Sequence, residues 1–500
     1  MSLNEIISLA LRKNWFYPSA EIYASRQAGF FDYSAEGLKI RDNITKTWRR
    51  MLVEKEGFIE VSGSVVLPKE VFVASGHLDN FNDPLIECSE CDAVHRADHL
   101  IRRATNKVIP ENLSVNEIEG LIKEHKIKCE KCDSYLVNEV KKFSLMLKTN
   151  VGNGEKNEAF LRPETCQNIF STFPRLYKNS RQELPLGISQ VGKSFRNEIA
   201  PRNYLIRERE LHQLETEIFF NPRKINELPD EKWNFVKEKK LNLVKADSEK
   251  TESLSFEELL DKKIVSGKLI AYHMALLQEF FLALSIPFKK TRFRELNKDE
   301  KPFYSKETFD FEVQSENGFI ELVACNYRTD YDLKSHEKQS KQKLSVKEEG
   351  NEFTPHVFEL SIGLDRTFLM VLENVFRKEK RGPEERIFMS FPLSLAPQLV
   401  GVFPLVKKDG LKELAFEIHE ELQKMGLDSL FDEKGSIGKR YARIDEDGVP
   451  FGVTVDYDSL KDQTVTLRER DSMSQKRILI KELSHTLMKL ERNLINFKGL

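Results

Sequence analysis

The sequence predicts an α+β domain built on an antiparallel sheet, with a cysteine-bearing insertion, followed by a smaller α/β domain. Three observations support this prediction. Residues 188–199 and 211–220 alternate between apolar and polar side chains, which is typical of two half-buried strands of a hairpin. Two Cys-x-x-Cys pairs lie within residues 84–142, and strand and helix patterns alternate over residues 391–500. A chain of 500 residues also exceeds a single core, so two or three domains are expected.

Composition indicates an ordinary globular protein. Charged residues make up 32% and hydrophobic residues 40%, and the net charge of −2 gives no overall attraction to nucleic acid, so any such surface must be a local basic patch. We expect no membrane segment, because the most apolar stretch, residues 270–288, contains His273 and Glu279. The first residues show no secretory signal, and few cysteines indicate a reducing compartment, so we expect a cytoplasmic location.

The two faces of the hairpin differ in character. Apolar residues such as Val191, Phe195 and Leu214 share one face. The other face carries small, polar and charged residues, namely Gln190, Gly192, Ser194, Arg196, Glu198, Gln213, Glu215 and Glu217. This face could simply meet water. Gly192 and Ser194 instead favour a ligand lying against the strand, because a solvated face has no need of small residues.

The segment GISQVGKSFRNEIAPR, followed by LETEIFF, resembles motif 2 of class II aminoacyl-tRNA synthetases and is similar in particular to glycyl-tRNA synthetases of the archaeal and eukaryotic type. The resemblance extends in order over nearly the whole chain. It implies a homodimer that activates glycine with ATP and Mg²⁺ and transfers it to tRNA(Gly). It also implies a class II catalytic domain at 1–390, with insertions at about 84–142 (zinc knuckle) and about 221–285 (helical), and an anticodon-binding domain at 391–500.

The N-terminal part of the chain is expected to hold a long helix and a strand. Residues 37–56 place apolar side chains on one stripe of a helix, and residues 57–72 form an apolar strand that Pro68 ends. Together they resemble motif 1, which forms the dimer interface of class II synthetases. A homodimer is therefore expected.

Four cysteines follow as two pairs. Cys88 and Cys91 form the first pair, and Cys129 and Cys132 form the second, a spacing that can close tetrahedrally on a structural zinc ion. Four unrelated reduced cysteines are the alternative. The intervening residues include a helix with a capping box, in which Ser114 precedes Glu117.

The resemblance assigns roles to individual residues. Arg196 would bind the α-phosphate, Arg207 the other phosphates and Arg366 the γ-phosphate, while Glu198 would accept from the adenine amine and Glu321 would hold Mg²⁺. Arg196, Glu321 and Arg366 are the implied catalytic residues. The implied ATP-binding set is Arg196, Asn197, Glu198, Ile206, Arg207, Leu211, Glu321, Leu322, Gly363 and Arg366. The implied glycine-binding set is Arg96, Glu164, Glu215, Glu217, Glu359 and Ser361, with Arg96 otherwise a lone surface arginine.

The strand that follows Gly318 is the next to contribute to the site. Simple alternation predicts that Glu321 shares a strand face with Val323 and Cys325. Motif 3 is expected at residues 355–376, where Gly363 permits the turn into a helix whose first turn carries Arg366.

Several residues depart from the pattern of the family near this site. They are Cys166, Asn168, Leu211, Ala324 and Tyr327. Cys166 and Asn168 are expected to add bulk close to Glu164. These departures leave open a synthetase-like paralogue that binds RNA or a partner without aminoacylation. A class II enzyme for alanine, serine or threonine fits the Glu359 and Ser361 pattern less well.

The C-terminal region reads as a compact α/β domain. We expect apolar strands at 395–406, 449–459 and 464–470, a helix at 411–425 and a closing helix at 475–497. A basic set could meet phosphates, although each member could also be ordinary surface charge. Its members are Lys439, Arg440, Arg443, Arg468 and Arg470.

Overall fold

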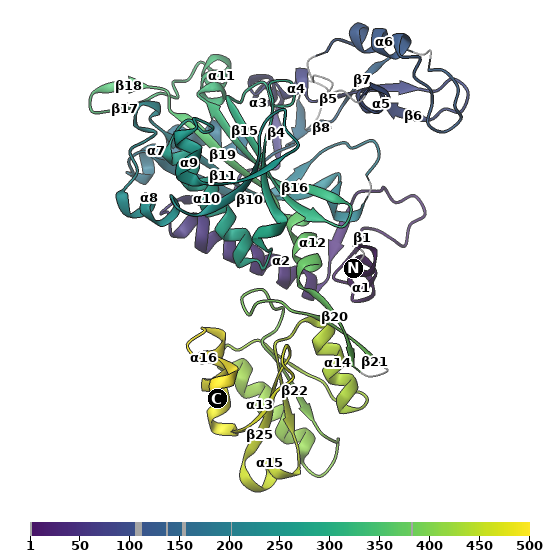
Figure 1. Cartoon of the computed structure of the whole chain (residues 1–500), viewed down its shortest axis with the longest axis vertical. Coiled ribbons are helices and arrows are strands. Elements are labelled where there is room, and N and C mark those ends of the chain that lie inside the picture. The colour runs from purple at the N-terminus through teal and green to yellow at the C-terminus, as the bar shows by residue number, and fades with distance from the viewer. Residues whose placement is uncertain (1–2, 106–112, 137–138, 153–156, 202, 382–383) are drawn as a thin grey trace.

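The computed structural model of the chain describes residues 3–105, 113–136, 139–152, 157–201, 203–381 and 384–500 (Figure 1). A large N-terminal part contains a nine-stranded sheet, and a smaller C-terminal part contains a five-stranded sheet. The smaller part lies at the bottom of Figure 1, next to the hairpin of β20 (Phe376–Arg381) and β21 (Glu384–Met389). The predicted α+β class is confirmed, with a mostly antiparallel large sheet.

The nine strands of the large sheet pair antiparallel except at two places. The β3–β10 and β12–β14 pairs are parallel. From edge to edge the strands are β13 (Thr251–Ser255), β12 (Lys240–Val244), β14 (Thr291–Glu295), β15 (Glu307–Ser315), β16 (Gly318–Thr329), β19 (His356–Gly363), β11 (Glu210–Phe220), β10 (Leu186–Phe195) and β3 (Ile59–Val61).

Helices cover the two faces of this sheet unequally. The main core lies on one face, where α2 (Ala35–Trp48), α10 (Lys268–Ala283) and α12 (Leu364–Val375) pack against the apolar side chains of the strands. Part of the other face is covered by α7 (Cys166–Ser180) and α11 (Tyr331–Ser340). The rest of that second face carries polar side chains, and it holds the candidate site.

The predicted hairpin is present as β10 and β11, in a register that pairs Val191 with Leu214 and Gln190 with Glu215. The first strand ends earlier than expected, at Phe195. The amide of Arg196 still donates to the carbonyl of Arg209 at 2.9 Å, after which the chain leaves the ladder. The polar faces of the two strands coincide, as alternation predicted.

The prediction of a single strand at 57–72 is wrong. Two short strands in different sheets occupy this stretch, β3 and β4 (Val66–Pro68), and α3 (Lys69–Ala74) follows. The chain turns between them at Gly63, whose amide donates to Gln190 Oε1 at 2.6 Å and whose bare Cα makes room for Asn168. Pro68 precedes the first turn of α3, where a missing donor costs little.

The prediction that the insertion at 221–285 is helical is also wrong. The segment contains β12 and β13, which extend the large sheet, together with α8 (Asp230–Val236), α9 (Phe256–Asp261) and α10. Leu241 and Leu243 are buried on β12, and most of α10 is buried. The lysines and glutamates occupy the exposed positions between these apolar residues. Their number made the alternating pattern of the strands difficult to recognise in the sequence.

The cysteine-bearing insertion forms its own small core. It consists of β5 (Asn82–Glu87), β6 (Val94–Arg96), β7 (Lys141–Ser144), α5 (Ala97–Thr105) and α6 (Val115–Glu124). The capping box at the start of α6 is confirmed, since Ser114 and Glu117 exchange hydrogen bonds.

The remaining elements of the N-terminal part are short. They are α1 (Leu3–Arg12), β1 (Phe16–Pro18), β2 (Phe31–Tyr33), α4 (His77–Asn80), β8 (Leu147–Asn150), β9 (Glu158–Leu161), β17 (Val346–Glu348) and β18 (Asn351–Phe353). The helix expected at 37–56 is α2, continued over Arg49–Glu54 by a turn of wider, π-helical type.

The C-terminal sheet has the order β23 (Ser429–Phe431), β22 (Val400–Pro404), β24 (Phe451–Val455), β25 (Thr464–Glu469) and β26 (Gln475–Leu479). Its helices are α13 (Leu411–Lys424), α14 (Ile437–Asp447), α15 (Tyr457–Asp462) and α16 (Ile480–Glu491). The expected closing helix therefore begins later, because residues 475–479 pair with β25 as an edge strand. Within the described residues, no helix combines the length and apolar character needed to cross a membrane.

Candidate active site

Acidic side chains from neighbouring strands meet on the polar face of the large sheet. Glu215 and Glu217 of β11 lie directly opposite Ser361 and Glu359 of β19. Asn326 of β16 lies opposite Glu359 on its other side. The strand period places all five on one face, where facing side chains are close neighbours.

Glu359 is held by two partners. Arg328 Nη1 lies 3.0 Å from Glu359 Oε1, and Asn326 Nδ2 donates to Oε2 at 2.6 Å. Arg328 is buried and also binds both oxygens of Asp332, at 2.7 and 2.8 Å. Burial, together with the negative charge of Glu215, raises the pKa of Glu359 to about 8, even though Arg328 acts in the opposite direction.

The neighbouring carboxylates have oxygens without hydrogen-bond partners among the described residues. Glu217 is fully buried and neither of its oxygens accepts a hydrogen bond, and Glu215 Oε1 is also without one among the described residues. Glu215 Oε2 accepts from the hydroxyl of Thr165. Burial raises the pKa of Glu215, and burial and the charge of Glu359 raise that of Glu217 well above its usual range. Buried polar atoms without partners are rare, and each needs an explanation.

Glu164 completes the acidic cluster from the loop before α7. Its Oε1 accepts from Gln167 Nε2 at 2.8 Å and from Cys166 Sγ at 2.9 Å. His77 Nε2 lies 3.3 Å from the same oxygen. Burial would raise the pKa of Glu164, but His77 and Arg328 hold it well below its usual range. The cluster therefore contains an anchored carboxylate beside unpaired ones, and a small cationic group fits it.

Three arginines lie on the loop and helix beside this cluster. Arg196 donates to the carbonyl of Pro163 at 3.2 Å, and its guanidinium lies over the ring of Phe81. Arg207 is paired with Glu198 at 2.5 Å. Arg366, in the first turn of α12, donates to the carbonyls of Ile206 and Glu321, at 2.9 Å each. A helix N-terminus with a guanidinium in its first turn can bind phosphate.

Glu321 faces the site because of a bulge in β16. Val323 lies in regular register with β15, but Glu321 pairs with Glu312, so Leu322 is an extra residue. The predicted shared face of Glu321, Val323 and Cys325 is therefore wrong. A bulge turns the following side chain to the opposite face, and Glu321 is thereby turned away from the core.

Asp310 lies beside Glu321 on the same face. Arg294 Nη2 binds Asp310 Oδ2 at 2.9 Å, and burial together with the charge of Glu321 raises the pKa of Asp310 to about 8. Arg366 Nη1 lies 3.5 Å from Glu321 Oε2. Two carboxylates beside Arg366 could supply the hard oxygen ligands that Mg²⁺ prefers.

The space above Gly192 is filled by the protein itself. A Cβ at this position would lie 2.1 Å from Arg162 Nη2, and Arg162 Nε donates to the carbonyl of Lys193 at 2.9 Å. Ser194 is buried and donates to Gln213. The expectation that these small residues leave room for a ligand is therefore wrong. They accommodate a buried arginine that joins the strand to the loop preceding α7.

Two other expectations are changed by the structure. Asn168 points away from Glu164 and donates to the carbonyl of Ser64 at 3.2 Å, so only Cys166 adds bulk beside that carboxylate. Arg96 binds Asp83 at 3.0 Å and Asp98 at 2.6 Å, and it is not brought to the acidic cluster.

Comparison with known proteins agrees with this arrangement. The tRNA synthetase class II core domain (G, H, P, S and T) matches residues 147–253, which include β10 and β11, and an anticodon binding domain matches residues 399–490. The glycine–tRNA ligase of Pyrococcus furiosus is 36% identical, with 96% of this chain and 98% of that protein covered. The glycine–tRNA ligase of Methanococcus maripaludis is 35% identical over the same shares. The chain belongs to the glycine–tRNA ligase family.

Structural comparison supports the fold of this family member. A solved structure described as the RNA binding domain of threonyl-tRNA synthetase from Cryptosporidium parvum has a TM-score of 0.61 and covers 97% of both chains. Its sequence identity of 16% limits the likeness to the fold.

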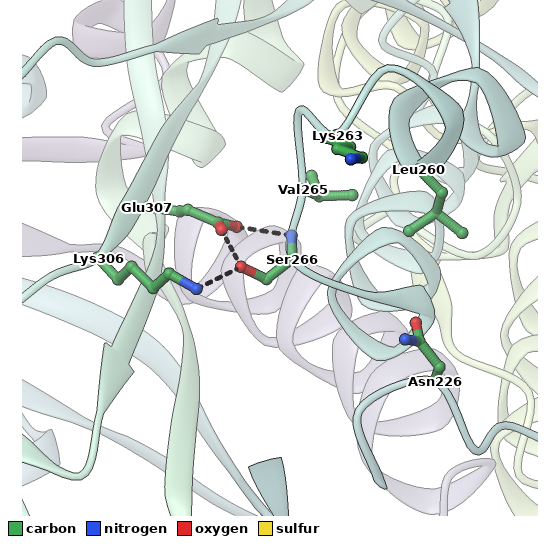
Figure 2. Close-up of a pocket in the computed structure, with 7 residues that line it drawn as sticks. All are labelled: Asn226, Leu260, Lys263, Val265, Ser266, Lys306 and Glu307. Atoms are coloured by element: carbon green, nitrogen blue, oxygen red, sulfur yellow. Dashed lines mark hydrogen bonds between the residues drawn. The ribbon is translucent and has the colours of Figure 1, made fainter. Parts of the chain in front are cut away.

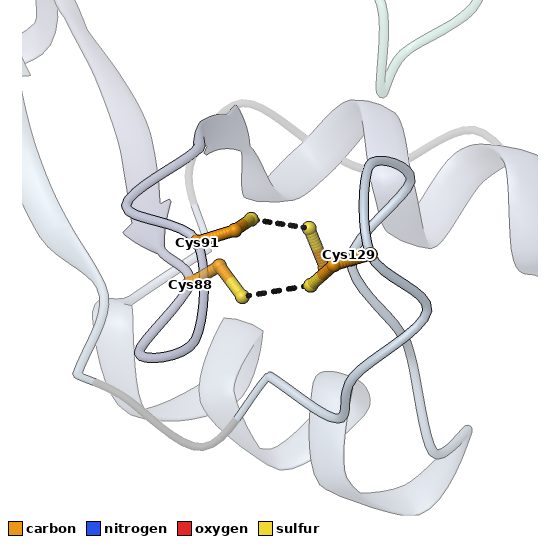
Figure 3. Close-up of side chains that lie close together, drawn as sticks. Cys88, Cys91 and Cys129 are labelled. Atoms are coloured by element: carbon orange, nitrogen blue, oxygen red, sulfur yellow. Dashed lines mark hydrogen bonds between the residues drawn. The ribbon is translucent and has the colours of Figure 1, made fainter.

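The cysteines of this glycine–tRNA ligase family member meet as predicted. Cys88 Sγ lies 3.5 Å from Cys132 Sγ, and Cys91 Sγ lies 3.6 Å from Cys129 Sγ (Figure 3). His95 Nε2 lies 3.2 Å from Cys129 Sγ. Four sulfur atoms this close together can hold a tetrahedral metal ion.

The basic set expected in the C-terminal domain is mostly internal. Arg440, Arg468 and Arg470 are each less than 5% exposed. Arg468 binds Asp445 through two contacts of 2.9 Å, and Arg470 donates to backbone carbonyls. The expectation that these three meet phosphates is therefore wrong. Of the set, Lys439 remains exposed.

A cavity of about 500 Å³ has a lining that contains no residue of the acidic cluster. Figure 2 shows the residues that line it. It is lined by Asn226, Leu260, Lys263, Val265, Ser266, Lys306 and Glu307. Ser266 links its two sides, since its amide donates to Glu307 at 3.1 Å and its hydroxyl accepts from Lys306 at 2.9 Å. None of the predicted site residues lines this cavity.

Sequence reasoning missed several residues that build the site in this glycine–tRNA ligase family member. Arg328 and Asn326 hold Glu359, and His77 contacts Glu164. The even-numbered positions of β16 gave a signal for the first two, because Asn326 and Arg328 alternate onto one face with Ala324. His77 lies in a separate short helix, α4, and no local pattern pointed to it.

Proposed function

We propose that the chain activates glycine with ATP to form glycyl-adenylate and diphosphate, and then transfers glycine to the 3′ end of tRNA(Gly). The observation that carries this proposal is the set of unpaired, buried carboxylate oxygens on Glu215 and Glu217. Such atoms are costly to bury without a partner. The ammonium group of glycine would supply hydrogen-bond donors and a positive charge at that place. The names of the curated relatives agree with this chemistry.

The same cluster accounts for selection of glycine. Glu164 and Glu359 are fixed by neighbouring side chains, and Ser361 lies opposite Glu215, so side chains already surround the proposed glycine site. A substrate with a Cβ substituent would have to displace one of these side chains. Steric exclusion of this kind discriminates against larger amino acids.

Activation requires positioning rather than a protein nucleophile. The carboxylate of glycine attacks the α-phosphate, a bond forms between them, and diphosphate leaves with the electron pair. Arg196 is the proposed partner of the α-phosphate, because a planar guanidinium can bind two oxygens at once. Arg366 is the proposed partner of the γ-phosphate. Fixed positive groups of this kind stabilise developing negative charge.

The ATP side of the site would change on binding. Glu198 and Arg207 pair with each other, whereas we propose that Glu198 accepts from the adenine amine and Arg207 contacts phosphate. The pair would open or shift as ATP enters. The backbone of Asn197, Ile206 and Leu322, the side chain of Leu211, and the turn at Gly363 complete the proposed ATP site. The side chain of Leu322 itself packs in the main core.

We propose Glu321 as the Mg²⁺ ligand and Asp310 as a second oxygen donor beside it. The four knuckle cysteines would hold a structural zinc ion, with all its positions filled and His95 donating to the thiolate of Cys129. We further propose a homodimer formed through the α2 region, and a cytoplasmic location.

Glycine-dependent exchange of labelled diphosphate into ATP tests the proposal on the purified chain. We expect exchange with glycine and none with alanine or serine at equal concentration. Absence of exchange in a protein that still binds tRNA(Gly) would contradict it and favour a synthetase-like paralogue.

A further inference from the structure

Cys166 adds a sulfur atom to the acidic cluster of the large sheet. One ligand atom from each of Cys166, Glu215, Glu217 and Glu359 lies within 4.8 Å of all the others, and all four side chains are buried. Among the described residues, neither oxygen of Glu217 and only one oxygen of Glu215, Oε2, has a hydrogen-bond partner. The cluster therefore offers one sulfur and several oxygens to a positive ligand.

Buried acidic groups outnumber the cations beside them. Arg328 pairs with Asp332 and Glu359 and lies 3.9 Å from Glu164, whereas Glu217 has neither oxygen paired among the described residues. A divalent cation could take ligand oxygens from more than one of these carboxyl groups at once. A bound cation is often the largest local charge in such a site. It offsets the repulsion between ligands of like charge that lie close together.

We propose that this pocket also binds a thiophilic divalent cation, of the Zn²⁺ or Cd²⁺ class, through Cys166 Sγ and the carboxylates of Glu215, Glu217 and Glu359, in competition with the amino acid. One sulfur and three oxygens in a compact group suit a four-coordinate ion. Mg²⁺ fits poorly, because it prefers six oxygens and keeps several waters. The inference rests on the proposed function only in naming glycine as the ligand that competes with the cation.

Binding replaces a proton rather than requiring a redox partner. In the empty pocket Cys166 donates its S–H to Glu164 Oε1 at 2.9 Å. The metal–sulfur bond forms as this proton leaves for solvent, and any proton held by the carboxylates leaves with it. Glu164 stays hydrogen-bonded to Gln167. The ligand atoms, which lie within 4.8 Å of one another, would draw closer to reach metal–ligand distances of about 2.0–2.3 Å.

Equilibrium dialysis of the full-length protein against Cd²⁺ tests the site directly. Cys166→Ala is compared with Cys325→Ala, which removes a buried cysteine from the core face of β16 and leaves the knuckle equally intact. We expect the Cys325 variant to match the wild type and the Cys166 variant to bind one Cd²⁺ fewer. Equal stoichiometry in all three would overturn the inference. Cys166→Ser, which keeps the volume and the hydrogen bond, serves if the alanine variant fails to fold.

Diphosphate exchange supplies the second readout. Cd²⁺ should raise the KM for glycine without changing kcat in the wild type and in the Cys325 variant. The rise should be about tenfold smaller in the Cys166 variants, the scale on which metal affinity falls when a site is perturbed. Equal inhibition of the Cys166 and Cys325 variants would overturn the role of the thiol. If no protein shows exchange but the stoichiometry still differs, the proposed function fails and the metal site stands.

Discussion

At the scale of a single residue, Glu217 is a buried carboxyl group that lowers the stability of the folded protein. Its carboxylate is fully buried with neither oxygen paired, and its folded-state pKa is raised well above the unfolded value. A raised pKa means that the folded protein favours the protonated form. Stability linked to this group is therefore complete below the unfolded pKa and declines as pH rises through the folded pKa.

Replacement of Glu217 by Gln should stabilise the empty protein and abolish glycine-dependent exchange. The gain at pH 8 should be about 1–3 kcal/mol, because glutamine cannot ionise and each unit by which burial raises the carboxyl pKa costs about 1.4 kcal/mol. Because ionisation causes the loss, the rise in Tm should be larger at pH 8 than at pH 5. Thermal unfolding at the two pH values measures this. Glu249→Gln, at an exposed position between β12 and β13, is the control and should change neither property. A lower Tm for the Glu217 variant at pH 8 would contradict this account.

Glu359 differs from Glu217 because its partners are fixed. Glu359→Gln removes the charge that Arg328 binds at 3.0 Å, within the proposed ammonium site. We expect the KM for glycine to rise about 10–100-fold, which corresponds to a charged hydrogen bond of about 1.5–3 kcal/mol. The KM for ATP should stay within a factor of two or so, since the residue lies outside the proposed nucleotide site. Exchange assays with each substrate varied in turn separate the two, and an equal change in both would be inconsistent with the assignment.

Leu211 tests the nucleotide side of the site. It is half-buried at the start of β11, opposite Ser194, where the resemblance places a stacking aromatic. Leu211→Phe should lower the KM for ATP about fivefold, because a ring that stacks on adenine contributes about 1 kcal/mol beyond the area it buries. The KM for glycine is expected to remain as in the wild type. An unchanged or higher KM for ATP would show that this side chain does not cover the base.

At the scale of elements, one carboxylate joins three segments behind the proposed phosphate site. Asp365, in the first turn of α12, accepts from the hydroxyl of Tyr33 at 2.6 Å and from the backbone amide of His212 at 2.5 Å. His212 in turn contacts Arg41 of α2 at 3.1 Å. Burial would raise the pKa of Asp365, but the hydrogen bonds of His212 and Tyr33 lower it. The start of α12, and with it Arg366, is positioned by this network.

Asp365→Asn should therefore impair the adjacent arginine without removing it. We expect kcat for diphosphate exchange to fall about 10–100-fold, as second-layer hydrogen bonds to a functional group commonly contribute. Since the folded pKa of Asp365 is lowered, its stabilising contribution is lost as pH falls below about 4. The acid side of the unfolding profile should consequently flatten in the variant. A purely structural role would lower Tm at every pH and leave kcat in the folded protein unchanged.

The elements also show which features a sequence can predict. The hairpin of β10 and β11 could be predicted because the alternation of apolar and polar residues assigns each side chain to one face of its strand. The orientation of Glu321 was not, because the bulge at Leu322 depends on the partner strand. Arg162 above Gly192 was missed for a related reason: a glycine shows that space is needed, but not which group fills it. Charge-rich composition likewise hid β12 and β13.

For the molecule as a whole, the β20–β21 hairpin connects the large sheet to the C-terminal domain. Arg386 of β21 binds Asp445 of α14 at 2.9 Å and donates to the carbonyl of Arg470 at 2.6 Å. Asp445 is buried and also binds Arg468. The residues of the proposed adenylation site all lie in the large part, whereas we expect tRNA to contact both parts and so to depend on their relative placement.

Loss of this contact should therefore separate the two proposed steps. Arg386→Ala leaves Asp445 paired with Arg468, so the C-terminal domain should stay folded while its attachment loosens. We expect kcat/KM for aminoacylation of tRNA(Gly) to fall about tenfold or more, because misplacement of a bound substrate by about 1 Å is that costly. Glycine-dependent exchange should be unaffected. Lys378→Ala is the matched control, since Lys378 lies on the same hairpin but pairs with Glu5 and Glu385. An equal loss of exchange and aminoacylation in the Arg386 variant would instead place this contact within the activation step.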